Sequence, residues 1–140
     1  MRIKVMYQSQ TGNTKKVAEA IAHVAGCTAE PVGMATVSEP VDMLFLGAAI
    51  HASHIDPSVK KFIEGLNPTL VKKVTVFSTG FEEAAGKAAG IMRDLLIRRG
   101  VQVTGECYFC RGKFLFFNRA HPDAGDLTRA EEYARSVLAT

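Results

Sequence analysis

A nearly unbroken apolar run, VDMLFLGAA at residues 41–49, constrains the fold more than any other stretch of the chain. A strand with apolar side chains on both faces is typical of a parallel sheet covered on both sides by helices. Another strand pattern, KKVTVFSTG, occupies residues 72–80. Between them, Asp56 and Pro57 predict a helix start, because a carboxylate caps the first turn and proline fits the first helical position. This region therefore predicts a β–α–β unit with parallel strands.

Strand and helix patterns alternate along the rest of the chain. The expected strands cover residues 2–8, 27–32, 41–49, 72–80 and 101–109. The expected helices are one that ends at Gly26, one that begins at Pro57, one that ends before Gly100 and a last one that Asp126 caps. Because the chain has 140 residues and no linker or repeat, we expect a single α/β domain over residues 1–140.

Composition and charge narrow the class of protein. The hydrophobic share of 47% and the charged share of 22% are ordinary for a soluble globular domain. No apolar run is long enough to span a bilayer, and MRIKVMYQSQ turns polar too early for a signal peptide, so we expect a cytoplasmic protein without membrane insertion. Three cysteines do not suggest a disulfide framework. The net charge of +3 is scattered, so we expect no nucleic-acid partner.

Three loops are expected to form a ligand site. In open α/β sheets, ligands bind beyond the carboxyl ends of the strands, at the point where the strand order reverses. Applied to the expected strands, this rule selects residues 8–14, 48–56 and 78–83.

The first of these loops, SQTGNT, has the composition of a phosphate cradle built without lysine or arginine. A turn from a strand into a helix presents backbone N–H groups and the positive end of the helix dipole. Hydroxyl and amide side chains add donors, and a glycine lets the backbone approach closely. The loop lacks GxxxxGK[ST] and GxGxxG, which disfavours a P-loop NTPase and a dinucleotide-binding fold. An ordinary capped turn has the same spacing, and this alternative stays open here.

YQSQTGNTKKVAEAI resembles the phosphate-binding signature of the flavodoxin family, in which a [ST]-x-T-G-x-T loop holds the FMN phosphate. VDMLFLGAAI and VTVFSTG resemble the third and fourth strands with their flavin-contacting loops, and HPDAGDLTRAEEYA resembles the start of the last helix. Without a long insertion in its last strand, the chain is similar to the short-chain type. The resemblance implies a flavodoxin-like, doubly wound five-stranded parallel sheet, in the order 2-1-3-4-5 with helices on both faces, that binds FMN noncovalently.

By position, the resemblance implies a cofactor-binding residue set in three parts. The first loop would hold the phosphate, the second would cover one side of the isoalloxazine ring, and the third would cover the other side and contact the pyrimidine edge. The implied residues are Ser9, Gln10, Thr11, Gly12, Asn13, Thr14, Ala48, Ala49, Ile50, His51, Ala52, His54, Ser78, Thr79, Gly80 and Phe81. We expect neither a catalytic side chain nor a metal ligand.

The sequence departs from the family pattern at the flavin ring. Flavodoxins commonly place aromatic side chains, often Trp and Tyr, against the ring, and this chain has no Trp. His51 and His54 are the ring-shaped candidates in the second loop, and Phe81 is the candidate in the third. The histidines are equally compatible with exposed loop positions, and Phe81 with packing at the start of the next helix.

Cys107 and Cys110 form a single C-x-x-C for which three interpretations stay open. The cysteines are structural, supply a thiol near the flavin or a substrate, or bind a metal that would need two further ligands. The nearby phenylalanines are interpreted as core or as a docking patch for a partner protein; they are Phe109, Phe114, Phe116 and Phe117.

The resemblance implies an electron-transfer flavoprotein, a flavodoxin that shuttles electrons from a reductase to a partner redox enzyme, and we expect it to be a monomer. An electron carrier is favoured over a stand-alone enzyme because the sequence shows no substrate-specific constellation. The alternative is an FMN-dependent oxidoreductase acting directly on a small or planar substrate, of the quinone reductase or protoporphyrinogen oxidase type. A flavin-free signalling domain is disfavoured, because Gln8 and Ser9 stand where response regulators carry acidic residues.

Overall fold

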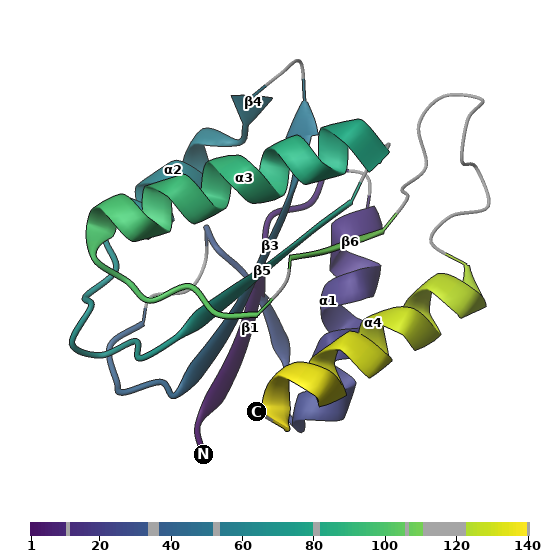
Figure 1. Cartoon of the computed structure of the whole chain (residues 1–140), viewed down its shortest axis with the longest axis horizontal. Coiled ribbons are helices and arrows are strands. Elements are labelled where there is room, and N and C mark those ends of the chain that lie inside the picture. Colours follow the sequence, from purple (N-terminus) through teal and green to yellow (C-terminus); the bar gives the residue numbers. More distant parts are fainter. Residues whose placement is uncertain are drawn as a thin grey trace.

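Helices and strands form three layers, with the sheet between two layers of helices (Figure 1). The computed structural model describes residues 1–10, 12–33, 37–51, 54–79, 82–105, 107–110 and 123–139. The strands are β1 (Ile3–Tyr7), β2 (Ala29–Pro31), β3 (Met43–His51), β4 (His54–Ile55), β5 (Val74–Thr79) and β6 (Tyr108–Cys110). The helices are α1 (Asn13–Ala25), α2 (Pro57–Glu64), α3 (Glu82–Arg99) and α4 (Ala124–Leu138).

The main sheet has the order β2-β1-β3-β5-β6, and all of these neighbours pair in parallel. This confirms the predicted doubly wound order of five parallel strands. Strand β4 was not predicted: it pairs antiparallel with the end of β3, so that Ile50 lies opposite Ile55 and His51 opposite His54. Part of the expected loop at residues 48–56 is therefore a short β-arm.

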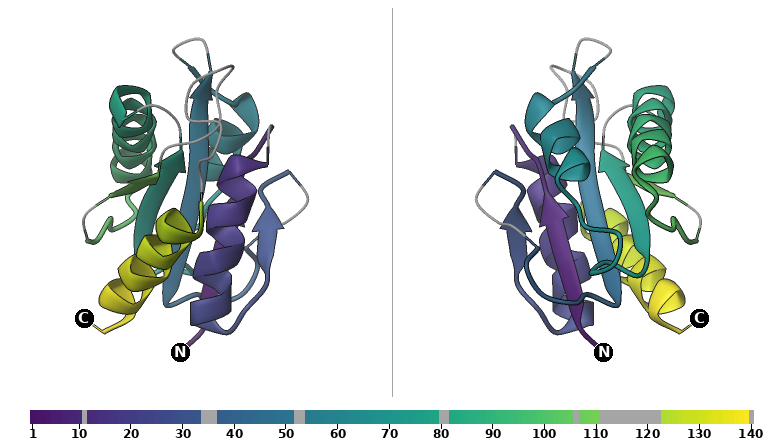
Figure 2. Two further views of the ribbon diagram at one scale, coloured as in Figure 1. Left: turned by 90° about the vertical axis from the view of Figure 1, so that its right-hand side faces the viewer. Right: turned by 90° about the vertical axis from the view of Figure 1, so that its left-hand side faces the viewer.

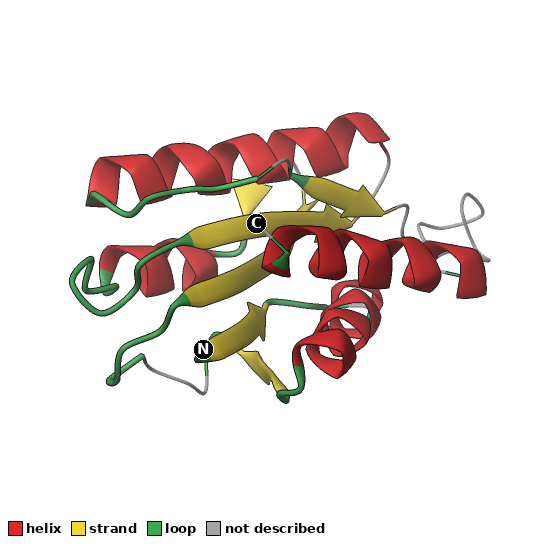
Figure 3. Ribbon diagram, turned by 60° about the horizontal axis from the view of Figure 1, so that its bottom comes forward, coloured by secondary structure: helices red, strands yellow, loops and turns green. Residues whose placement is uncertain are grey.

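Two hydrophobic cores lie on the two faces of the sheet, because successive side chains of a strand point to opposite faces. Leu44 and Leu46 of β3 pack in one core with side chains of α2 and α3. Met43 and Phe45 pack in the other core with side chains of α1 and α4. Figure 3 shows the helices on both sides of the sheet. The apolar run that dominates the sequence is thus explained by a strand buried on both faces.

Some element ends differ from the expected ones. The last helix is capped by Asp123 rather than Asp126: the Asp126 N–H donates to the Asp123 carboxylate at 2.8 Å, and the Asp123 N–H donates to the Asp126 carboxylate at 3.1 Å. This reciprocal capping box satisfies two helix-end donors and starts the helix earlier than predicted. The expected strand at residues 101–109 is reduced to β6 and a single bridge between Val74 and Val103, because Gly105 adopts a φ of +74° that breaks the extended backbone.

Other predicted helix ends are confirmed. Gly26 ends α1 in the left-handed conformation, and Gly100 follows α3 with a φ of +90°. Asp56 caps α2 by accepting from the Ser58 N–H at 2.9 Å.

The arrowheads of the strands point to one end of the molecule, and both termini lie toward the other end (Figure 2). The carboxyl ends of β1, β3 and β5 therefore lie at the same edge of the sheet. Within the described part of the chain, no helix combines the length and the apolar character that crossing a membrane requires.

Candidate functional site at the carboxyl edge of the sheet

The loop between β1 and α1 is held by backbone and side-chain hydrogen bonds. The Gln8 N–H donates to the Gly47 carbonyl at 3.0 Å, which continues the pairing with β3 beyond the end of β1. The Ser9 hydroxyl accepts from the Gly12 N–H at 3.0 Å. Gly12 has a φ of +91°, and a Cβ built there would meet nothing within 4 Å. Glycine is favoured by this backbone conformation, and the space above it is open.

Helix α1 begins in a way that suits an anion. Its N-cap is Gly12, a residue without a side chain to cap the helix, and its first turn carries no acidic residue. By contrast, aspartates cap α2 and α4. Backbone N–H groups at a helix start and the positive end of the dipole attract negative charge, and no aspartate competes for that place in α1. The residues present therefore fit a phosphate group.

Two buried threonines connect the first loop region to the third. The hydroxyls of Thr14, in α1, and Thr79, at the end of β5, are 2.7 Å apart, and both residues are almost completely buried. Asn13, which directly precedes Thr14, is also buried. A hydroxyl has one donor and two acceptor sites, so one hydroxyl of the pair can accept from the other and still donate its own proton to a ligand.

The second and third loop regions begin as paired strand residues. Ala48 lies opposite Ser78, and Ala49 opposite Thr79. The side chains of Ala48 and Ser78 are fully buried, whereas Ala49 is half-buried. His54, in β4, is exposed. From these positions, Ala48 and Ser78 would approach a ligand through the backbone rather than through their side chains.

Some of the implied residues cannot be placed. Thr11, Ala52, Gly80 and Phe81 lie outside the described residues, as do the side chains of Ile50 and His51. The interpretation of Phe81 and His51 as ring contacts stays a prediction. Phe114, Phe116 and Phe117 lie outside the described residues, as do the side chains of Phe109 and Cys110 in β6. Cys107 is a half-buried free thiol just before β6.

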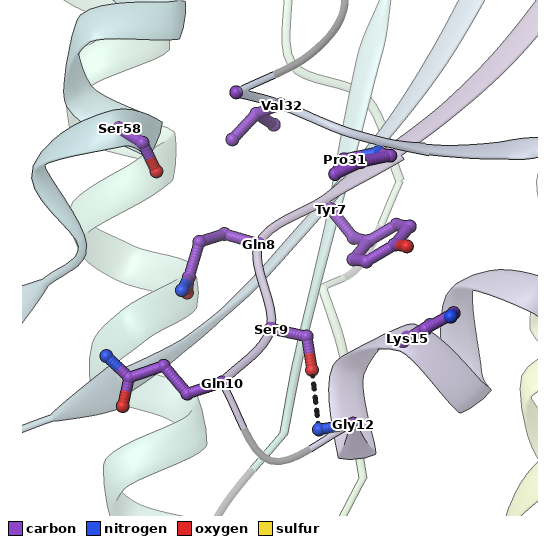
Figure 4. A pocket seen from close by; sticks show the side chains of 10 residues that line it. Tyr7, Gln8, Ser9, Gln10, Gly12, Lys15, Pro31, Val32 and Ser58 are labelled. Carbon is purple, nitrogen blue, oxygen red and sulfur yellow. Dashed lines mark hydrogen bonds between the residues drawn. The ribbon is translucent and has the colours of Figure 1, made fainter.

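A cleft of about 360 Å³ opens beside the first loop (Figure 4). We call it the first-loop cleft; it is lined by Tyr7, Gln8, Ser9, Gln10, Gly12, Lys15, Pro31, Val32, Gly33 and Ser58. Its lining includes the end of β2 with the residues that follow it, and Ser58 in the first turn of α2. Sequence reasoning selected Ser9, Gln10 and Gly12 but missed Lys15, Ser58 and the residues after β2, which no local pattern marks.

Metal binding finds no support in the part of the chain that the structure describes. No group of three or more His, Cys, Asp or Glu residues there is arranged to hold a metal ion.

Comparisons with known proteins agree with this arrangement. A family model described as "Flavodoxin domain" matches residues 4–115. An uncharacterized protein of Methanocaldococcus jannaschii is 27% identical over 150 residues, which cover 99% of each chain. The structure of oxidised flavodoxin 1 from Bacillus cereus is 19% identical and superposes with a TM-score of 0.79 over 99% of this chain and 98% of that one. A flavodoxin, WrbA-like protein from Agrobacterium tumefaciens is 17% identical, with a TM-score of 0.71 and coverage of 99% and 95%.

Proposed function

Since the chain belongs to the flavodoxin domain family, we propose that it binds FMN noncovalently and carries electrons from a reductase to a partner redox enzyme. The observation that carries this proposal is the start of α1, which has a glycine at the N-cap, no acidic residue in its first turn, and open space at Gly12. When bound, FMN supplies the electron-accepting chemistry, and the protein supplies binding, orientation and electrostatics. We further propose that the protein acts as a cytoplasmic monomer.

In this function, the first loop binds the phosphate of FMN. The contact between Ser9 and Gly12 holds the loop in shape before a ligand arrives, and the Thr14–Thr79 pair positions a hydroxyl at the start of α1. Lys15 lies in the first turn of α1 and lines the first-loop cleft, where its charge favours an anion.

Absorption spectroscopy tests the proposal directly. The purified protein, with FMN added if necessary, should show a flavin spectrum and should bind FMN more tightly than riboflavin, which lacks the phosphate.

Thr11→Ala together with Thr14→Ala should weaken FMN binding, since a hydroxyl bonded to a charged acceptor contributes about 1.5–3 kcal/mol. Thr128→Ala is the matched control, because this exposed threonine lies on α4 and bonds to a carbonyl of its own helix. Equal binding of FMN and riboflavin would refute the phosphate cradle.

A direct FMN oxidoreductase, of the quinone reductase or protoporphyrinogen oxidase type, is the second candidate function. The absence of Trp favours it, because a ring face without a bulky aromatic cover is open to a planar substrate. Anaerobic reductive titration separates the two candidates. A carrier should accumulate one-electron-reduced flavin at the midpoint, whereas passage straight to the two-electron-reduced form would favour the oxidoreductase.

A further inference from the structure

The side chain of Gln8 is poorly satisfied where it lies. Its Oε1 atom is buried and has no hydrogen-bond partner among the described residues. Its Nε2 donates to Asp56 Oδ2 over 3.4 Å, which is long for an N–H···O bond. A buried carbonyl without a donor is costly, so native structures seldom leave one unless a ligand or water completes it.

Asp56 explains why the amide does not simply turn over in place. Oδ1 of this carboxylate accepts from the Ser58 N–H at 2.9 Å and from the Ser58 hydroxyl at 2.6 Å, so the carboxylate is fixed at the start of α2. Exchanging the two ends of the Gln8 amide would bring its oxygen against Asp56 Oδ2. The favourable move is a rotation of the half-buried side chain into the first-loop cleft, which Gln8 already lines.

Gln8 also lies between the expected phosphate site and the expected ring site. It directly precedes the residues expected to hold the phosphate, and its amide faces Asp56, which follows the β3–β4 arm expected beside the ring. The part of FMN that connects phosphate and ring is a polyol, whose hydroxyls are hydrogen-bond donors.

The geometry points to Gln8 as a specificity-determining residue whose amide oxygen accepts a hydrogen bond from a hydroxyl of the cofactor's polyol chain. This inference rests on the proposed function, because it assumes that the chain binds FMN. The phosphate and ring contacts select for flavin phosphates in general, and Gln8 adds selection for the hydroxylated chain.

The test compares two ligands in two proteins. The ligands are FMN and a flavin phosphate whose five-carbon chain lacks the hydroxyls, and the proteins are the wild type and Gln8→Met, which keeps the side-chain length without an acceptor. Quenching of flavin fluorescence gives each Kd. We expect Gln8→Met to weaken FMN binding about tenfold and to leave binding of the deoxygenated ligand unchanged. We also expect the melting temperature of the flavin-free variant to equal or exceed that of the wild type, because the unpaired oxygen is gone.

Gln102→Met is the matched control, since Gln102 is an exposed glutamine outside the site, and it should change neither Kd. The ¹⁵N resonance of the Gln8 side-chain amide in the wild type should shift more with FMN than with the deoxygenated ligand, which tests the contact even if the variant folds poorly. Equal loss of affinity for both ligands would make Gln8 merely structural, and no loss for either would assign its oxygen to water; both results would overturn the inference. If the wild type binds no FMN at all, it is the proposed function that fails.

Discussion

Among the glycines that the structure describes, Gly47 of β3 has the least room for a side chain. A Cβ at this position would lie 2.1–2.6 Å from three ring atoms of Phe77, which is itself fully buried. Gly47→Ala should therefore lower the free energy of unfolding by about 1–3 kcal/mol, the usual cost of overpacking a core. It should also weaken FMN binding, because the Gly47 carbonyl accepts from Gln8 at the start of the first loop. Urea unfolding and a flavin titration measure the two effects.

Gly90→Ala is the control for this substitution. Gly90 is an exposed residue within α3, and a Cβ there would meet nothing within 4 Å. Alanine should stabilise the helix by about 0.5–1 kcal/mol at such a position. A Gly47→Ala protein as stable as the wild type would show that the Phe77 ring moves aside without cost.

For single residues, the sequence predicts those features that depend only on neighbouring positions in the chain. Gly12 and the polar residues around it are recognisable because a strand, a glycine turn and a helix start follow one another directly. The unpaired oxygen of Gln8 is not recognisable, since it depends on Asp56, a residue 48 positions away. The closeness of Gly47 and Phe77 is equally hidden, because two strands must first pair before the ring meets the glycine.

Among the elements, the start of α4 tests which aspartate caps the helix. Asp123 is the N-cap and Asp126 closes the capping box. Asp123→Ala should cost about 1 kcal/mol of stability, and Asp123→Asn much less, because asparagine also caps well. Thermal unfolding at neutral pH measures both variants. If Asp123→Ala proved harmless, the predicted cap at Asp126 would be the better description.

Helix α4 also contacts the sheet through Tyr133. Its hydroxyl lies 2.5 Å from the Thr75 hydroxyl of β5, its ring stacks on Tyr108 at 5.1 Å, and it meets Phe45 edge-on. Burial raises the pKa of Tyr133, and the hydrogen bond with Thr75 lowers it by less. In the unfolded chain a tyrosine loses its proton near pH 10, so above that pH the unfolded state binds fewer protons and stability falls as pH rises.

We therefore expect the alkaline loss of stability to be less steep in Tyr133→Phe. This variant should be less stable than the wild type at neutral pH, because it gives up the bond to Thr75, but its free energy of unfolding should fall less above pH 10. Urea unfolding at neutral pH and at several alkaline values gives the comparison. If the free energy of unfolding fell equally steeply above pH 10 in both proteins, a group other than Tyr133 would cause the loss of stability at alkaline pH.

The elements themselves are largely predictable from periodicity, but some of their ends are not. The run at 41–49 predicts a buried strand because both faces are apolar, and the structure confirms it as part of β3. The sequence extends the fifth strand too far, since alternation over residues 101–109 does not reveal that Gly105 takes a positive φ. The β4 arm depends on antiparallel pairing between His51 and His54. The two residues between them in the sequence, Ala52 and Ser53, carry no glycine or asparagine signal for a hairpin.

For the whole molecule, the balance of charge bears on the reduction potential. The chain carries 17 Lys and Arg against 14 Asp and Glu, a net charge of +3. Typical flavodoxins are acidic, and their negative surroundings disfavour the anionic, fully reduced flavin. A positive molecule favours that anion. We expect the second reduction step to occur at a higher potential than in acidic flavodoxins.

Salt distinguishes this charge effect from local contacts. Mobile ions screen exposed charges with a Debye length of about 10 Å at 0.1 M ionic strength and about 3 Å at 1 M, while they hardly affect direct contacts to the flavin. If the net positive charge raises the potential, the potential should fall toward that of acidic flavodoxins as ionic strength increases. Potentiometric titration with redox dyes at low and high salt measures this. A potential as low as that of acidic flavodoxins at low salt would contradict the argument. A high potential independent of salt would instead point to the residues proposed to lie beside the ring, such as His54.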